Sequence, residues 1–158
     1  MGYLKERELR LMTDLELFFA ENTEDIAEVE YVASARFKDK KGKPLPWKLK
    51  ALTPAQNDEL KKKCLKRVPV FGNKGQYREE FDQMQYVMLL TASTVTFPDL
   101  NNVSLQQSWS KKVGYDIMTP TDLLNAMLTA GEYDLLTAKC QEVSGYDDIN
   151  EDAETAKN

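Results

Sequence analysis

Few residues in this sequence have the types and spacing that chemistry requires. The chain has 158 residues and no histidine, so it lacks the usual metal ligand and the commonest general base near neutral pH. Acidic pairs such as Glu79 with Glu80 and Asp147 with Asp148 have no nucleophile, base or metal ligand close by in sequence. We interpret these pairs as charges at a helix start or in a tail. The sequence therefore predicts no catalytic residue, no cofactor and no metal site.

One glycine-rich stretch is typical of ligand binding. Gly72-Asn73-Lys74-Gly75 has the G-x-x-G pattern with which KH domains clamp a nucleotide backbone, and it falls between two predicted helices. A KH domain also needs strands where this sequence predicts helix, so we favour a plain glycine turn. The P-loop pattern does not occur, because no Gly-Lys-Ser or Gly-Lys-Thr is present.

The charged residues are unevenly distributed along the chain. The sequence has 21 basic and 26 acidic residues, a net charge of −5. The stretch from Arg36 to Arg67 nevertheless has twelve Lys or Arg against three acidic residues. Nucleic-acid binding by this basic hairpin and helix, residues 36–67, is therefore an alternative to a surface that faces solvent or a protein partner. Stacking on bases would require exposed aromatic rings, whereas we expect Phe37 and Trp47 to be buried.

The apolar residues, 42% of the chain, are enough for the core of one domain, which we assign to residues 1–146. Cys64 and Cys140 fall at apolar positions of predicted helices, which indicates buried free thiols and a reducing cytoplasm. The charged N-terminus resembles neither a signal peptide nor a membrane anchor. The tail at residues 147–158 is acidic and poor in aliphatic side chains, so we expect it to be disordered.

A central helix is predicted between Glu79 and Thr96, the longest apolar stretch in the chain. Its apolar residues recur at spacings of three and four, which predicts a helix that other elements cover on most sides. The residues of that apolar stripe are Phe81, Met84, Met88, Ala92 and Val95. The stretch is too short and too polar at its ends to cross a bilayer.

A β-hairpin is predicted before this helix. Apolar and polar residues alternate from Val29 to Phe37 and again from Trp47 to Ala51, with a turn at 39–43 and lysines on the outer face. Thr53 and Pro54 begin a helix that we expect to run to about Arg67, followed by an irregular connection at 68–77.

Short helices are predicted on either side of these elements. Thr13 and Glu16 form a capping box for a helix that ends by Asn22. Further helices are expected over 104–111, closed by Gly114, then from Thr119 and Pro120, and after a break at Gly131 as far as Gly145. The fold class is therefore α+β: a mainly α-helical domain with an N-terminal antiparallel β-hairpin packed on a central apolar helix.

Several stretches, taken in order, resemble one protein family. These are RFKDKKGKPLPWKLKALT, the Cys64-x-x-Arg67-Val68-Pro69-Val70 run, Gly72-x-x-Gly75-Gln76-Tyr77, FPDLNNVSLQQSW and LLNAMLTAGEYDLL. Together they are similar to the tail assembly chaperones of long-tailed phages and of phage-like elements in Gram-positive bacteria, the XkdN-like family. The resemblance covers about residues 15–146.

The resemblance implies a non-enzymatic phage or prophage protein that acts in the bacterial host cytoplasm during tail assembly and is absent from the mature tail. The implied partner is the tape measure protein, a long, aggregation-prone helical chain that such chaperones keep soluble while the tail tube assembles around it. The tail tube protein and a second copy of the chain are further candidate partners, and no membrane is implied.

The basic stretch suits contact with acidic segments of a partner. The residues that we expect to bind a partner are Arg36, Lys48, Lys50, Lys61, Lys62, Lys66 and Arg67. Met84, Met88, Met118 and Met127 would offer adaptable apolar contacts if they were exposed, but we favour core positions for them.

Overall fold

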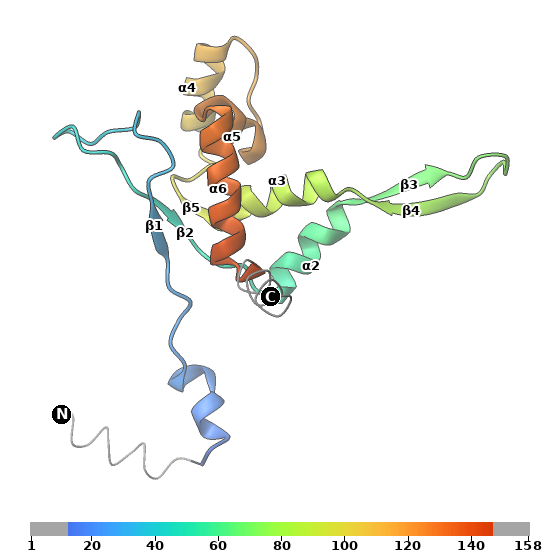
Figure 1. Ribbon diagram of the computed structural model, residues 1–158, viewed down its shortest axis with the longest axis horizontal. Helices are drawn as coiled ribbons and strands as arrows, with labels where there is room; N and C mark the ends of the chain where they lie inside the picture. Colours follow the sequence, from blue (N-terminus) through green and yellow to red (C-terminus); the bar gives the residue numbers. More distant parts are fainter. Residues whose placement is uncertain (1–12, 147–158) are drawn as a thin grey trace, which may run out of the picture.

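Helix α3 lies in the middle of this computed structural model, which describes residues 13–146 (Figure 1). The bounds of the described elements are η1 Glu16–Phe18, η2 Ala20–Asn22, β1 Val29–Tyr31, β2 Trp47–Leu49, α2 Pro54–Lys63, β3 Leu65–Pro69, β4 Tyr77–Phe81, α3 Gln83–Thr94, β5 Val95–Phe97, α4 Val103–Val113, α5 Pro120–Met127 and α6 Ala130–Val143. The fold is α+β, with five α-helices and two small antiparallel sheets in this part of the chain. The predicted tail at 147–158 lies outside the described residues.

Helix α3 packs against α2, α5 and α6, and it continues directly into β5. Its partners therefore come from both directions along the chain, as predicted. The predicted start at Glu79 is wrong. Asp82 caps the helix, its carboxylate accepting a hydrogen bond from Gln85 N at 3.0 Å, and the preceding residues belong to β4.

The apolar stripe of α3 differs from the predicted one. Ala92 and Val95 are buried, but Phe81 and Met84 are exposed. The buried residues of the helix are Tyr86, Leu90, Thr91, Ala92 and Thr94. The buried face is rotated away from Met84 because α2 and α6 cover the Tyr86, Leu90 and Thr94 side.

The larger sheet has the strand order β1-β2-β5, and both pairings are antiparallel. The predicted pairing of the first two runs is confirmed, with Val29 opposite Leu49 and Tyr31 opposite Trp47. Beyond Tyr31 the predicted strand is wrong, since Ala33 and Ser34 are both buried and the alternation ends there.

The turn between β1 and β2 is stabilised by one side chain. The Asp39 carboxylate accepts hydrogen bonds from the backbone N–H groups of Lys41 and Lys43, at 2.8 and 2.9 Å. Gly42 has a φ of 84°, a left-handed conformation that favours glycine. The third strand, β5, was not predicted. The packing of a two-stranded hairpin on the central helix stays a prediction. Helix α3 reaches this sheet through β5, the strand that directly follows it and pairs with β2.

Helix caps account for most of the predicted helices. Thr53 and Thr129 each form a reciprocal capping box, with Gln56 and Glu132 respectively, and Gly114 ends α4 with a φ of 83°. Two predicted boundaries are wrong. Helix α2 ends at Lys63 instead of Arg67, because the chain turns into β3 after Cys64, and Gly131 lies in the first turn of α6 because Thr129 caps the helix before it.

The predicted irregular connection at 68–77 is also wrong in part. Strands β3 and β4 pair antiparallel over their full length, from Leu65 opposite Phe81 to Pro69 opposite Tyr77. The glycine pair of the G-x-x-G pattern therefore lies in the loop of a β-hairpin. The KH-type clamp is excluded, since that clamp requires helices on both sides of the loop.

Two buried clusters hold the body together. The larger one joins the sheet to α3, α5 and α6 and includes Trp47, Leu49, Leu123, Leu124, Leu136 and Cys140. The smaller one joins α2 to α3 through Leu60, Cys64, Tyr86 and Leu90. In the part of the chain described here, no helix is long and apolar enough to cross a membrane.

Candidate binding surfaces

The hairpin of β3 and β4, residues 65–81, extends away from the body, and we call it the hairpin arm (Figure 1). Its loop is closed by backbone hydrogen bonds from Val70 N to Gln76 O at 3.0 Å and from Gln76 N to Asn73 O at 3.2 Å. Gly72 and Gly75 have φ values of 84° and 79°. An isolated two-stranded hairpin is marginally stable in water, so an arm of this kind gains stability when a partner covers it.

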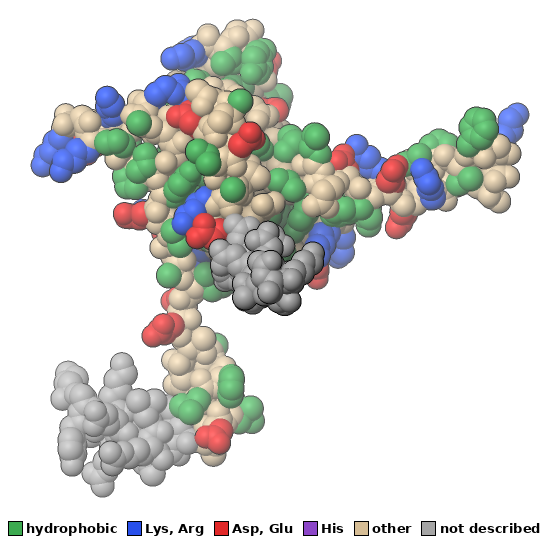
Figure 2. Space-filling model, in the orientation of Figure 1, with side chains coloured by type: hydrophobic (Ala, Val, Ile, Leu, Met, Phe, Trp, Pro, Cys, Tyr) green, Lys and Arg blue, Asp and Glu red, His purple; other side chains and the backbone are tan. Residues whose placement is uncertain are grey.

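One face of the hairpin arm carries most of its apolar side chains, together with the paired charges of Arg67 and Glu79. Paired residues share a face, which places Leu65 with Phe81 and Pro69 with Tyr77 on the same side. Leu65 is 47% exposed and Tyr77 is 54% exposed, and Phe71 in the loop is fully exposed. Figure 2 shows apolar side chains gathered toward the end of this arm, with a basic residue beside them.

The base of the hairpin arm carries an ion pair and a cation–π contact. Lys66 Nζ lies 2.7 Å from the Asp82 carboxylate, and this contact lowers the pKa of Asp82 and raises the pKa of Lys66. The guanidinium of Arg67 lies 4.8 Å from the centre of the Tyr77 ring. Lys66 therefore links β3 to the cap of α3, and Arg67 links the two strands of the arm to each other.

Four of the predicted partner-binding residues lie near the base of the hairpin arm. Lys61 and Lys62 are in the last turn of α2, and Lys66 and Arg67 follow on β3. All four side chains are exposed. Lys62 makes one exposed ion pair with Glu59 at 3.3 Å, an interaction that contributes little stability.

Lys48 and Lys50 lie apart from that group, on and just after β2. Their side chains are exposed, in contrast to Trp47 and Leu49 on the inner face of the strand. Lys48 Nζ lies 5.9 Å from the centre of the Phe97 ring on the neighbouring strand. The predicted lysine-bearing outer face is therefore confirmed. No side-chain hydrogen bond or ion pair among the described residues joins it to the lysines of α2.

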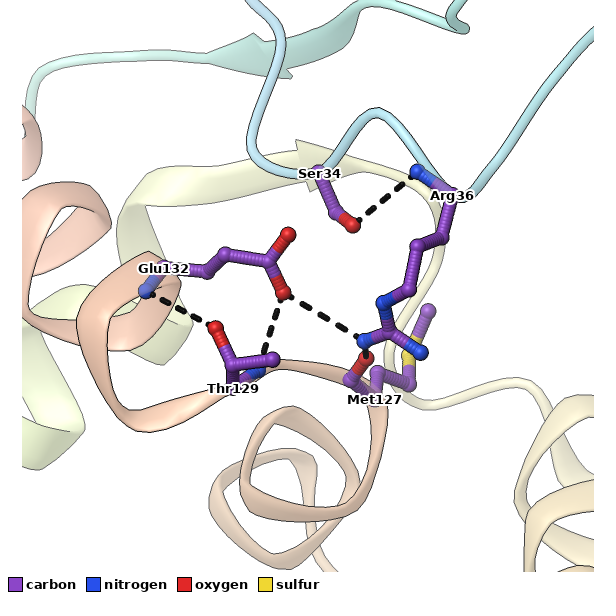
Figure 3. Close-up of polar contacts among 5 residues, drawn as sticks. All are labelled: Ser34, Arg36, Met127, Thr129 and Glu132. Carbon is purple, nitrogen blue, oxygen red and sulfur yellow. Dashed lines mark hydrogen bonds and ion pairs between the residues drawn. The ribbon is translucent and has the colours of Figure 1, made fainter.

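Arg36, the remaining predicted residue, is engaged within the molecule. Its guanidinium donates to the carbonyl of Met127 at the end of α5 and lies 3.3 Å from the Glu132 carboxylate in the first turn of α6 (Figure 3). Arg36 N donates to Ser34 Oγ at 3.2 Å. Arg36 thus ties residues 33–37 to the turn between α5 and α6, and its side chain is half exposed.

The pKa of the Glu132 carboxyl is strongly lowered by the groups around it. The Ser34 hydroxyl, the Thr129 backbone N–H and the Arg36 guanidinium lower the pKa of Glu132 to about 2. Thr129 N donates to the carboxylate at 2.9 Å, and the Ser34 hydroxyl lies beside it without hydrogen-bond geometry to it (Figure 3). The ionised carboxylate is therefore the form that the folded chain favours.

Protonation of Glu132 should weaken the fold in acid. Since its pKa is lower in the folded chain than in the unfolded chain, its contribution is complete above about pH 4.5 and is lost as the pH falls toward 2. Urea unfolding at pH 7 and pH 3 should therefore show a smaller acid-induced loss for Glu132→Gln than for the unaltered chain. Glu142→Gln, at an exposed helix position, is the control, and equal losses in all three chains would contradict the assignment.

A second exposed apolar region precedes the first sheet. We call residues 13–24 the N-terminal segment; it contains η1 and η2, and Leu15 is 71% and Phe18 is 82% exposed. The reciprocal Thr13–Glu16 hydrogen bonds are present, but the predicted single helix is wrong, because the extended backbone of Phe19 divides the stretch into two 3-10 turns. Within the described chain, the hydrogen bonds of this segment join only its own residues.

A groove of about 710 Å³ runs beside α4. Its walls include Val103, Gln106, Ile117 and Met118, and Asp116 is its one carboxylate. Met118 is 78% exposed, whereas Met127 is buried, so the expectation that the methionines are core residues holds for Met127 and is wrong for Met118 and Met84. A lone carboxylate in an open groove does not form the paired acid and base that hydrolysis requires.

Both cysteines are buried free thiols, as predicted. Burial raises the pKa of Cys140 to about 12, and desolvation likewise raises the pKa of Cys64. Neither thiol has the lowered pKa of a nucleophile. No group of three or more Cys, Asp or Glu side chains suited to a metal ion occurs between residues 13 and 146.

Cys140 should be almost unreactive until the chain unfolds. In a Cys64→Ala variant, which leaves one thiol, alkylation at pH 8 should be at least about a thousandfold slower in buffer than in urea, because both access and thiolate fraction are low. The thiol packs against Thr91 O of α3 at 3.8 Å, so the assay reports the contact between α6 and α3. Rapid labelling of the native chain would contradict this packing.

Comparisons with known proteins relate the whole chain to one family. The sequence profile described as phage XkdN-like tail assembly chaperone protein matches residues 15–157. The phage-like element PBSX protein XkdN of Bacillus subtilis is 31% identical over 147 residues, which are 92% of this chain and 94% of that protein. YqbN of the same organism is 29% identical over 154 residues, 97% and 98% of the two chains. The crystal structure of YqbN has a TM-score of 0.64 and 27% identity, covering 85% of this chain and 98% of that one.

Proposed function

Since this chain belongs to the XkdN-like family of phage tail assembly chaperones, a non-enzymatic family, we propose that its client is the tape measure protein. In this proposal the chaperone binds the tape measure chain in the host cytoplasm, keeps it soluble and promotes assembly of the tail tube around it. The tail tube protein is a further candidate partner. The family match over residues 15–157 is the observation that carries the proposal.

The hairpin arm is the surface that best suits a client. Its exposed aromatic side chains, Phe71 and Tyr77, are of the kind that dominate binding energy at protein interfaces. Lys74 and Arg78 are close to them in sequence, and no acidic residue occurs between Lys61 and Arg78. An amphipathic client segment with acidic residues along one side would complement both the apolar and the basic parts of this surface.

The predicted basic residues have different roles in this proposal. Lys61, Lys62, Lys66 and Arg67 lie near the base of the hairpin arm and would contact the same client segment. Lys48 and Lys50 would meet a second part of a long client. Arg36 would act mainly by holding the α5–α6 turn, because Met127 and Glu132 already engage its guanidinium.

Co-expression with the tape measure protein of the same phage or prophage tests the proposal. The client should be insoluble alone, become soluble with the chaperone and co-purify with it at moderate salt. If its solubility is unchanged and the two proteins do not associate, the proposed client is wrong.

Binding of single-stranded nucleic acid is the alternative, and one observation favours it. The hairpin arm exposes Phe71 and Tyr77 close to basic residues, a combination on which bases stack. Fluorescence anisotropy with a labelled oligonucleotide separates the two functions. Nucleic-acid affinity should fall steeply as salt rises, whereas an apolar client contact should change little.

A further inference from the structure

Two exposed stretches of the chain have opposite charge. Between Asp14 and Glu30 there are seven acidic residues and no Lys or Arg, whereas between Lys61 and Arg78 there are seven basic residues and no Asp or Glu. All seven basic side chains are exposed, as is every acidic one in the first stretch except that of Glu16. Charges of one sign gathered in this way attract a partner of the other sign.

Both stretches also present apolar side chains to solvent. The N-terminal segment exposes Leu15 and Phe18, and the hairpin arm exposes Phe71 and Tyr77. Each element is of a kind that is only marginally stable by itself in water. The N-terminal segment consists of two 3-10 turns, too short for an isolated helix, and the hairpin arm is a two-stranded ribbon.

The two elements leave the body in different directions. In Figure 1 the N-terminal segment lies below β1, whereas the hairpin arm extends sideways beyond α2 and α3. Within the described residues, no hydrogen bond or ion pair joins one element to the other. The surface that complements the N-terminal segment is therefore available on another copy of the chain.

We propose that the N-terminal segment of one copy docks on the hairpin arm of a second copy. Leu15 and Phe18 would cover Tyr77 and Phe71. Acidic residues such as Glu21 and Glu24 would face Lys74 in the loop and, round the edge of the two-stranded arm, Arg78 on its other face. The contact joins two different surfaces, so each copy offers one free segment and one free arm, and association continues head to tail into a ring or a chain. The proposal does not rest on the proposed function, since it needs no client.

Charge reversal tests this contact on the purified chain alone. Glu21→Lys with Glu24→Lys reverses the charge at two positions of the segment and brings its net charge from −4 to zero, and Lys74→Glu with Arg78→Glu changes the net charge of the arm from +2 to −2. None of the four side chains makes an ion pair among the described residues. Sedimentation velocity at low salt should show concentration-dependent association of the unaltered chain. Each reversed variant alone should associate at least about tenfold more weakly.

Mixing the two variants is the decisive measurement. In an equal mixture, the two lysines introduced in the segment of one variant meet the two glutamates introduced in the arm of the other, and the unaltered acidic segment meets the unaltered basic arm, so association should return. Lys40→Glu with Lys41→Glu, in the exposed turn between β1 and β2, changes the net charge as the arm variant does and should leave association unchanged.

Three results would overturn the proposal. These are a monomeric unaltered chain at all concentrations tested, association that neither reversal weakens, and variants that stay monomeric when mixed. Circular dichroism confirms that each variant is folded. If a reversal disturbs the fold, Leu15→Ser with Phe18→Ser replaces it, because these exposed side chains lie in a segment that hydrogen-bonds only to itself, and this variant should also lose association.

Discussion

Replacement of Trp47 by alanine should lower the free energy of unfolding by about 3–5 kcal/mol. The Trp47 side chain is 2% exposed and lies in the larger core cluster, with its ring centre 6.2 Å from that of Phe37. Total stabilities of domains are about 5–15 kcal/mol, so a large share of the fold's stability depends on this one side chain. The melting temperature should fall by about 6–20 °C.

Two neighbouring variants make this prediction specific. Lys48→Ala, at the next position on the outer face of β2, should change the stability by less than about 0.5 kcal/mol. Trp47→Phe keeps an aromatic ring in the core and should cost less than Trp47→Ala. Urea denaturation followed by circular dichroism measures all three. A loss below about 1 kcal/mol for Trp47→Ala would show that β2 is not packed as described.

Removal of the two exposed aromatic side chains from the hairpin arm should abolish the proposed chaperone activity with only a small loss of stability. Phe71→Ser with Tyr77→Ser deletes side chains that are 103% and 54% exposed, so the fold should be nearly unaffected. If each ring contributes about 2 kcal/mol to client binding, the pair would weaken it about a thousandfold. Co-expressed tape measure protein should then return to the insoluble fraction.

A matched pair of substitutions on another surface is the control. Tyr115 is 57% and Met118 is 78% exposed near the groove beside α4, so Tyr115→Ser with Met118→Ser removes similar apolar area. This control variant should keep the client soluble. If the control loses activity and the arm variant does not, the client binds beside α4, and the assignment of the hairpin arm is wrong.

The elements that the sequence predicted well are those built by neighbouring residues. A capping box such as Thr53 with Gln56 joins residues three positions apart, and the Asp39 turn closes within five residues. Both depend on side chains that compete for backbone groups next to them in the chain. Such patterns can be recognised without knowledge of the rest of the fold.

The hairpin arm was missed because its sequence fits two local structures. The basic run at 61–67 suits the C-terminal turn of a helix, and Glu79 with Glu80 suits the first turn of the next one. In the fold these charges face each other instead, with Lys66 opposite Glu80 and Arg67 opposite Glu79. Cys64 is the C-terminal cap of α2 and is fully buried against α3. After this residue the chain turns outward into β3, and this depends on a contact with a helix that lies further along the chain.

For the candidate site, the sequence could predict which kinds of residue take part but not which of them lie on one surface. The sequence alone determined that the chain lacks histidine, that it concentrates basic residues between Arg36 and Arg67, and that most helices begin and end where their caps lie. The tertiary structure decided which basic residues share a surface. Arg36 is engaged by α5 and α6, whereas Lys66 and Arg67 lie on the hairpin arm. The reason is that caps and turns are contacts between neighbours in sequence, but strand pairing and burial depend on residues far apart in the chain.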